Sequence, residues 1–278
     1  MDWLDALVLG IVQGLAEYLP ISSSGHLEIS REILGLKLSG ADSLQFDVVL
    51  HVATVLSTIV VLWKKFVPLC TSFFTMKKDE NTRYVWKILL SCIPVGIVGV
   101  FFKDEVESFF GSGTDGESNL LTVGICLCIT AALLSFAYFF RTRDFLKTKR
   151  SGRDITWVDA FVIGIGQAVA VLPGLSRSGT TIATGIILGD KREQVAQFSF
   201  FMVIIPILGE ALLDLVRMLG TEGAEASPVG LFPMAVGFIS SFIVGCLACN
   251  WMLELVKKGK LVWFALYCVT VGVLCICW

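Results

Sequence analysis

The segment QGLAEYLPISSSGHLE, which runs from Gln13 to Glu28, combines side chains that take part in proton transfer and nucleophilic attack. Gln13 and Glu17 are four residues apart, so they share one face of a helix that ends at the following Leu-Pro break. Hydroxyl and imidazole groups come directly after the break, at Ser22, Ser23, Ser24 and His26. A carboxylate or imidazole beside a hydroxyl can act as a general base that activates the hydroxyl as a nucleophile.

A second segment, PGLSRSGTT, runs from Pro173 to Thr181 and has the groups that bind a phosphate. Arg177 offers a planar, permanently charged fork for phosphoryl oxygens. Its neighbours add hydroxyl donors at Ser176, Ser178 and Thr181. These residues open a predicted helix, whose free N–H groups and dipole favour an anion.

The composition places both segments in a membrane protein. The mean hydropathy is +0.78, and 55% of the 278 residues are hydrophobic. Only 17% are charged, where a soluble domain has about 25%. The net charge of -2 gives no indication of a nucleic acid partner.

A charged side chain at membrane depth costs about 3 kcal/mol unless it is paired or solvated. Glu17 and Arg177 are therefore predicted to be functional, although a purely structural ion pair between them is an alternative. Any single serine here could instead hydrogen-bond a neighbouring helix. His51, four residues after Asp47 on one face of a predicted span, is left open between a structural and a functional role.

Six apolar stretches are long enough to cross a bilayer as helices. They are Phe46 to Trp63, Val85 to Phe102, Leu120 to Phe140, Val195 to Leu219, Val229 to Leu253 and Leu261 to Trp278. Two further stretches, Trp3 to Leu36 and Ile155 to Leu188, break at a cluster of Pro, Gly and Ser and resume for only about ten residues. Each is predicted to be a re-entrant helix-turn-helix hairpin, because irregular backbone at membrane depth must be buried in protein or line a polar cavity.

The two hairpins are copies of each other. With an offset of 154 residues, DALVLGIVQ (residues 5–13) aligns with DAFVIGIGQ (residues 159–167), and SSSG (22–25) aligns with SRSG (176–179). The chain therefore reads as one membrane domain, 1–278, built from a first repeat of about 1–150 and a second of about 151–278.

The basic residues predict the orientation of these repeats. Seventeen of the 22 lie in or beside four segments, 64–87, 141–153, 191–192 and 257–260, which the positive-inside rule assigns to the cytoplasm. The acidic loops 103–118 and 220–228 then lie outside. Each repeat has one hairpin and three spans, an odd number, so the repeats are inverted and the hairpin tips are predicted to meet near the midplane.

The quoted motifs resemble those of a known family. QGLAEYLPISSSGH is similar to the (E/Q)-x-x-x-E motif that is followed by S-S-[ST]-G-H, and LPGLSRSGTT is similar to P-G-x-S-R-S-x-x-T. Both motifs are typical of bacterial undecaprenyl pyrophosphate phosphatases, the bacitracin-resistance family. The resemblance covers essentially the whole chain apart from its loops.

The resemblance implies an all-α integral membrane enzyme of inverted-repeat fold, a homodimer in the cytoplasmic membrane with its active site open to the periplasm. Its expected reaction removes the terminal phosphate of a polyprenyl pyrophosphate and recycles the lipid carrier of cell-wall synthesis. The family's catalytic positions fall on Glu17, Ser23, His26 and Arg177. Its substrate-binding positions fall on Gln13, Ser22, Ser24, Ser176, Ser178 and Thr181. Glutamine at position 13 leaves Glu17 as the main carboxylate.

A divalent cation, Mg²⁺ or Ca²⁺, is also expected. A pyrophosphate monoester carries about three negative charges, and two like charges at 4 Å repel by about 4 kcal/mol at an effective dielectric constant of 20. Arg177 alone cannot offset both the substrate and Glu17, so a cation bridging Glu17 to the phosphates is predicted.

The sequence alone leaves two questions open. Ser23 is the favoured nucleophile with His26 as acid or base, but His26 could attack directly. A transporter or flippase for a lipid phosphate or small anion is the rival function, because inverted repeats with broken helices occur in many secondary transporters.

Overall fold

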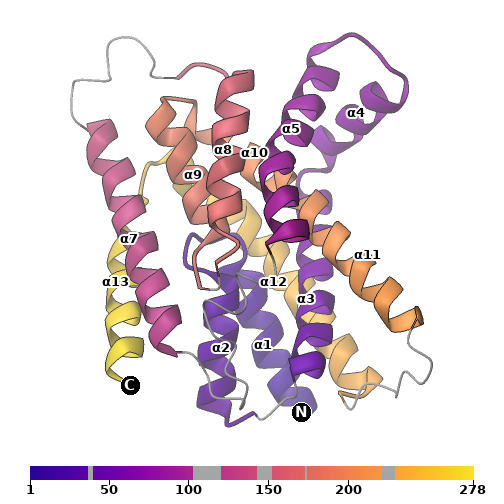
Figure 1. Ribbon diagram of the computed structural model, residues 1–278, viewed down its shortest axis with the longest axis vertical. Helices are drawn as coiled ribbons and strands as arrows, with labels where there is room; N and C mark the ends of the chain where they lie inside the picture. The colour runs from indigo at the N-terminus through magenta and orange to yellow at the C-terminus, as the bar shows by residue number, and fades with distance from the viewer. Residues whose placement is uncertain (37–39, 103–119, 143–151, 173, 221–228) are drawn as a thin grey trace.

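The computed structural model describes residues 1–36, 40–102, 120–142, 152–172, 174–220 and 229–278. Within these ranges the regular secondary structure is all α-helical, which confirms the all-α class (Figure 1). The helices are α1 (Trp3–Ala16), α2 (Ser23–Leu34), α3 (Gly40–Val61), α4 (Trp63–Phe74), α5 (Glu80–Phe101), α7 (Leu120–Thr142), α8 (Trp157–Val169), α9 (Arg177–Leu188), α10 (Arg192–Met202), α11 (Ile204–Gly220), α12 (Leu231–Lys257) and α13 (Val262–Cys277).

Five stretches of the described chain are long and apolar enough to cross a membrane. They are Ser43–Val61, Glu80–Phe101, Leu120–Phe140, Arg192–Leu213 and Leu231–Lys257. The sixth predicted span corresponds to α13, which is apolar but has only 16 residues. The chain is therefore an integral membrane protein of the all-α class.

Two details differ from the sequence prediction. The predicted span Val195 to Leu219 is two helices, α10 and α11, which meet at Val203. Pro206 explains this break, because proline has no N–H to bond the carbonyl four residues earlier and its ring clashes with that carbonyl. The short helix α4, which was not predicted, follows α3 directly.

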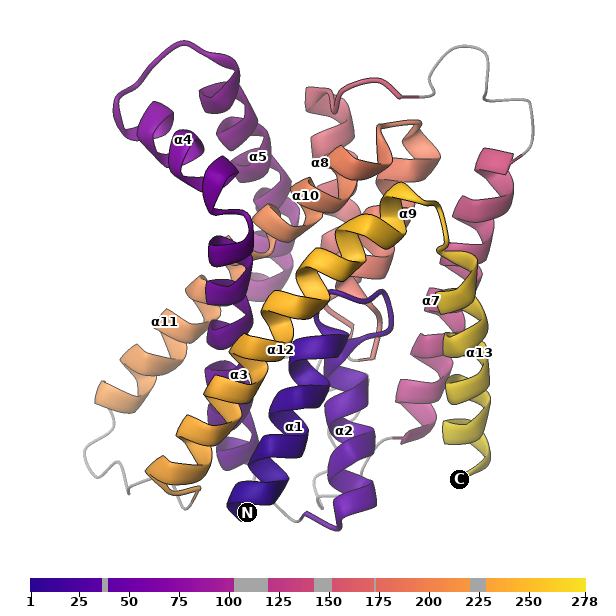
Figure 2. The same ribbon diagram turned by 180° about the vertical axis from the view of Figure 1, so that it is seen from behind.

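Each predicted hairpin segment contains a pair of short helices. The helices α1 and α2 have 14 and 12 residues, and α8 and α9 have 13 and 12. In both views the first pair occupies the lower half of the molecule and the second pair the upper half (Figure 1, Figure 2). The turns that connect the helices of each pair approach each other at mid-height.

Each pair packs against a long helix of the other half of the sequence. Helix α1 lies along α12, and α8 lies along α5. Glycines at equivalent positions of the duplication permit this approach. A Cβ on Gly10 would lie 2.0 Å from Oγ of Ser240, and a Cβ on Gly164 would lie 2.4 Å from the carbonyl oxygen of Ser91. The two halves are thus interlocked through close backbone contacts, as is common between membrane helices.

A larger side chain at Gly10 should therefore destabilise the fold. We expect Gly10→Leu to lower the melting temperature of the detergent-purified protein by several degrees or to prevent its folding, since overpacking costs about 1–3 kcal/mol. Gly96→Leu on α5 is the matched control, because a Cβ there would meet nothing within 4 Å. Equal melting temperatures for the two variants would contradict the close packing of α1 on α12.

The basic segments gather at one end of the molecule. Lys87 donates to the carbonyl oxygen of Ile155 at 2.7 Å, Lys191 pairs with Asp154 at 2.8 Å, and Lys257 pairs with Glu193 at 3.3 Å. These contacts join α5, α8 and α10 to the C-terminal end of α12, in the upper half of Figure 1 and Figure 2. These basic segments therefore lie on one side of the molecule, as the charge pattern predicts. The loops 103–118 and 220–228, and most of 141–153, lie outside the described residues.

Candidate active site

The first hairpin presents a carboxylate with its hydrogen bonds already in place. Helix α1 ends next to Glu17, whose Oε2 accepts from Nε2 of Gln13 at 2.9 Å and from Oγ of Ser23 at 2.7 Å. Gln13 is completely buried, and the Glu17 side chain is only 9% exposed. A hydroxyl that donates to a buried carboxylate is the arrangement that general-base activation needs.

The turn of the first hairpin is set by Pro20 and Ser22. Proline cannot continue the hydrogen bonding of α1, and Ser22 has a φ of 70°, so the chain reverses before α2 begins. Oγ of Ser22 then accepts from the backbone N–H of Gly25 at 3.2 Å and caps α2. This cap fixes Ser23 as the first residue of the helix, beside Glu17.

The second hairpin repeats this design and adds the arginine. Oγ of Ser176 accepts from the N–H of Gly179 at 3.0 Å and caps α9, so Arg177 is the first residue of that helix. Oγ of Ser178 donates to the carbonyl oxygen of Leu19 at 3.1 Å. This hydrogen bond joins the two hairpin turns directly and brings Arg177 to the same site as Glu17.

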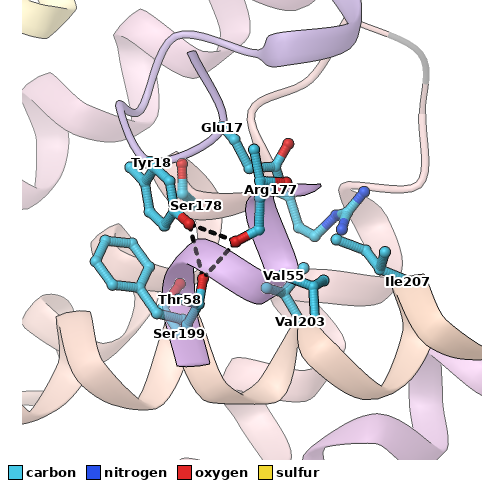
Figure 3. A pocket seen from close by; sticks show the side chains of 11 residues that line it. Glu17, Tyr18, Val55, Thr58, Arg177, Ser178, Ser199, Val203 and Ile207 are labelled. Carbon is cyan, nitrogen blue, oxygen red and sulfur yellow. Dashed lines mark hydrogen bonds between the residues drawn. The ribbon is translucent and has the colours of Figure 1, made fainter. Parts of the chain in front are cut away.

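Glu17 and Arg177 line one pocket (Figure 3). No ion pair within 4.0 Å joins these two side chains, both of which are described. Nη1 of Arg177 and Oε1 of Gln13 are buried without a hydrogen-bond partner in the described part of the chain. The geometry does not support the structural Glu17–Arg177 ion pair. It leaves a donor and an acceptor available to a ligand.

The remaining pocket wall consists of hydroxyl groups and apolar side chains, most of which are labelled in Figure 3. The hydroxyl groups come from Tyr18, Thr54, Thr58, Ser178 and Ser199. The apolar side chains come from Val55, Phe200, Val203 and Ile207. The break between α10 and α11 at Val203 therefore contributes directly to the site.

Two predicted residues point elsewhere. Nδ1 of His26 bonds the carbonyl oxygen of Ser22 at 2.8 Å, and its Nε2 bonds the hydroxyl of Tyr267 on α13 at 2.8 Å. The His26 and Tyr267 rings are also stacked, with centroids 5.6 Å apart. Ser24 is exposed, and its hydroxyl lies 3.4 Å from that of Ser22. Neither His26 nor Ser24 lines the pocket with Glu17. Gln13 and Ser23 are not lining residues either, but both hydrogen-bond the Glu17 carboxylate that does line it.

Thr181 lies one helical turn beyond Arg177. Its hydroxyl bonds that of Ser199, a pocket residue, at 2.6 Å and also donates to the carbonyl oxygen of Arg177 at 2.9 Å. Thr181 therefore supports the start of α9 from behind the pocket.

Two residues of the site, His51 and Tyr18, were given no role in the site from the sequence. Nε2 of His51 lies 3.6 Å from Oε2 of Glu17. The hydroxyl of Tyr18 donates to the carbonyl oxygen of Thr54 at 2.6 Å and bonds the hydroxyl of Thr58 at 2.9 Å, as Figure 3 shows by dashed lines. A histidine inside an apolar span was the available signal for His51, whereas the hydroxyls of α3 resembled ordinary polar residues of a membrane helix.

The chain is similar to known proteins over almost its whole length. Residues 6–274 match the family described as "Bacitracin resistance protein BacA". The chain belongs to the BacA family. An undecaprenyl-diphosphatase of Bacteroides fragilis is 54% identical over 276 residues, which cover 99% of this chain and 98% of that protein. The family predicted from the two motifs is thereby confirmed.

More distant relatives carry the same name. An undecaprenyl-diphosphatase of Oceanobacillus iheyensis is 36% identical over 273 residues, 96% of this chain and 93% of the relative. One from Methanosphaera stadtmanae is 34% identical over 291 aligned positions, 99% of this chain and 98% of the relative. The similarity to the BacA family therefore spans both hairpins and the helices that hold them.

The donor set of this BacA-family site fits a divalent cation that is shared with a ligand. The described residues contain no cluster of three or more His, Cys, Asp or Glu that could hold a metal by themselves. The Glu17 carboxylate and the unpartnered Oε1 of Gln13 nevertheless supply two adjacent oxygen donors. Mg²⁺ is often held by one or two carboxylates together with substrate phosphates and water.

Proposed function

We propose that this BacA-family protein hydrolyses undecaprenyl pyrophosphate to undecaprenyl phosphate and inorganic phosphate. The observation that carries the proposal is the pocket in which Glu17 of one hairpin faces Arg177 of the other, beside an apolar wall. The names of the relatives support the choice of substrate. The reaction returns the lipid carrier to cell-wall synthesis, and an excess of this activity would confer resistance to bacitracin.

The pyrophosphate binds at the polar part of the pocket. Arg177 uses its free Nη1 to hold a phosphoryl oxygen, and the hydroxyl of Ser178 and the N-terminus of α9 add further donors. The first units of the prenyl chain lie against Val203 and Ile207. Val203 lies at the break between α10 and α11 and Ile207 lies in the first turn of α11, so one site contacts both the head group and the prenyl chain.

A Mg²⁺ or Ca²⁺ ion held by Glu17 and Gln13 would reduce the negative charge of the pyrophosphate and polarise its bridging oxygen. The protein side chains perform the remaining tasks. Arg177 orients the terminal phosphate, and Gln13 keeps the Glu17 carboxylate on the face of α1 that looks toward Ser23. Positioning and charge stabilisation supply most of the rate in phosphoryl transfer.

Ser23 acts as the nucleophile in this account. Its oxygen attacks the terminal phosphorus while its proton moves to Oε2 of Glu17, the acceptor that it already contacts at 2.7 Å. The bond from the terminal phosphorus to the bridging oxygen breaks, and undecaprenyl phosphate leaves. The leaving phosphate takes the proton from Glu17. Water then attacks the phosphorus of the phosphoserine while Glu17 accepts the proton of the water, and the Ser23 oxygen leaves and regains a proton from Glu17. The contact of His26 with Tyr267 favours Ser23 over His26 for this role.

Acid quenching tests this step and the reaction itself. Protein mixed rapidly with substrate labelled in the terminal phosphate should release labelled phosphate and retain an acid-stable label that is absent from Ser23→Ala. Phosphohistidine is labile in acid, so an acid-labile label that persists in Ser23→Ala would assign the attack to His26. Labelled phosphate without a bound label in any variant would indicate direct attack by water.

We further infer that the helix pairs α1–α2 and α8–α9 are re-entrant hairpins of an inverted repeat. In this arrangement six helical passes surround them, the site opens to the periplasm, and the protein lies in the bacterial cytoplasmic membrane as a homodimer. The opposite placement of the two pairs in Figure 1 and Figure 2 supports the inversion. The gathering of basic segments at one end supports the orientation.

Cysteine labelling tests this topology. In a cysteine-free variant, Glu32→Cys at the exposed end of α2 should react with a membrane-impermeant maleimide from outside the cell. Lys258→Cys in the turn between α12 and α13 should react only after permeabilisation. Labelling of both positions from the same side would contradict the inverted arrangement.

A further inference from the structure

His51 on α3 lies beside Glu17 and has no part in the proposed reaction. Its Nε2 lies 3.6 Å from Oε2 of Glu17, and the His51 and Glu17 side chains are 20% and 9% exposed. His51 is held from the other side, because its Nδ1 bonds the carbonyl oxygen of Asp47 at 2.7 Å. The ring is therefore fixed between its own helix and the carboxylate.

The bond to Asp47 determines how the ring is presented. A carbonyl oxygen can only accept, so Nδ1 carries a proton and donates it to this oxygen. Nε2 is then the atom that faces Glu17, and it can donate toward the carboxylate when the ring carries a proton on both nitrogens. Such fixing of one ring nitrogen by a backbone carbonyl is the usual way in which a protein orients a histidine for work at the other nitrogen.

Three groups converge on the same carboxylate oxygen. Oε2 of Glu17 accepts hydrogen bonds from Nε2 of Gln13 at 2.9 Å and from Oγ of Ser23 at 2.7 Å. Nε2 of His51, on α3, lies 3.6 Å from the same oxygen. Gln13 and Ser23 belong to the hairpin itself, whereas His51 is a contact from outside it. Among the described residues, the other two contacts of this oxygen come from the hairpin of Glu17 itself, and the cationic Arg177 lines the same pocket. We therefore expect the carboxylate to turn toward Arg177 when His51 is removed.

We propose that His51 is a positioning residue, which holds the Glu17 carboxylate toward Ser23 by the attraction of its protonated Nε2, 3.6 Å from Oε2, for the carboxylate. The inference rests on the proposed phosphatase reaction for its kinetic consequence, but not for the contact itself. Two amide substitutions test the roles of Nε2 and Nδ1 of His51 separately. The change His51→Gln would place an amide N–H near the position of Nε2, whereas the shorter side chain in His51→Asn would reach only the position of Nδ1 and the Asp47 carbonyl.

The contact can be tested without substrate. The carboxylate stretching bands of Glu17 are obtained as the infrared difference between the wild-type protein and Glu17→Gln. We expect these bands to move in His51→Asn and to stay in place in His51→Gln. Unchanged bands in His51→Asn would overturn the proposal.

Turnover supplies the second measurement. With a long-chain prenyl pyrophosphate as substrate, we expect His51→Asn to lower kcat about tenfold with KM changed less than about twofold, and His51→Gln to stay within about threefold of wild type. In a Glu17→Gln background, His51→Asn should cost nothing further, because it acts through Glu17. Asn250→Ala, which changes an exposed amide on α12, is the control for general effects and should retain wild-type kinetics.

The outcomes separate this inference from the proposed function. If the wild type releases no phosphate but the Glu17 bands move in His51→Asn, the phosphatase proposal fails and the His51 contact stands. If the wild type is active and both His51 variants turn over normally, the positioning role is wrong and the phosphatase proposal stands. Equal losses in His51→Gln and His51→Asn, or losses that add to Glu17→Gln, would also reject positioning through Nε2.

Discussion

Arg177→Lys is expected to lower kcat/KM for undecaprenyl pyrophosphate by at least about 100-fold, which corresponds to about 3 kcal/mol of transition-state stabilisation. Lysine keeps the positive charge but loses the planar fork. The free Nη1 of Arg177 has no counterpart in a lysine, so the terminal phosphate would be held at a single point. Steady-state phosphate release by the detergent-purified variant measures the effect.

Arg83→Lys is the matched control, because Arg83 is exposed on α5 far along the chain from both hairpins. It should retain wild-type kinetics, and both variants should elute as folded protein from a sizing column. Near-normal turnover of Arg177→Lys would show that the site requires only a charge at this position, and the bidentate role would be wrong.

Glu17→Gln should cause a loss of similar size, at least about 100-fold in kcat/KM. The amide keeps the shape of the carboxylate, but it cannot take the proton of Ser23 and is a poor ligand for a divalent cation. The variant should still fold, since Gln13 and Ser23 can both bond an amide oxygen at this position. Phosphate release across a range of Mg²⁺ and Ca²⁺ concentrations measures both consequences.

Glu254→Gln serves as the control at the basic end of the molecule, where Glu254 pairs with Lys257 at 3.5 Å. An exposed ion pair contributes little, so its turnover should match wild type. A Glu17→Gln variant that turns over at the wild-type rate with the same cation dependence would remove Glu17 from both assigned roles.

The hairpins and their polar turns could be predicted because the signals are local. A Pro, Gly and Ser cluster inside an apolar run marks a break, and the repeated SxSG turn marks the caps that Ser22 and Ser176 form. The spacing of Gln13 and Glu17 likewise gave their shared face. These features depend on neighbours within a few residues, so the sequence contains them.

Features that depend on distant helices were not predictable in the same way. His26 follows the serines closely, yet it bonds Tyr267, which lies 241 residues away, and no local pattern indicates that contact. His51 reaches Glu17 only because α3 packs beside α1. The break at Val203 was missed because the apolar run continues through it, and hydropathy does not register a single proline.

We infer that the pocket between the hairpins breaks a phosphoric anhydride. The most direct measurement is phosphate release from a long-chain prenyl pyrophosphate by the purified wild-type protein in detergent with Mg²⁺ or Ca²⁺, alongside uptake of labelled phosphate or lipid phosphate into proteoliposomes. We expect release of inorganic phosphate in step with formation of the prenyl monophosphate. Transport into proteoliposomes by a protein that releases no phosphate would contradict this inference and favour the transporter.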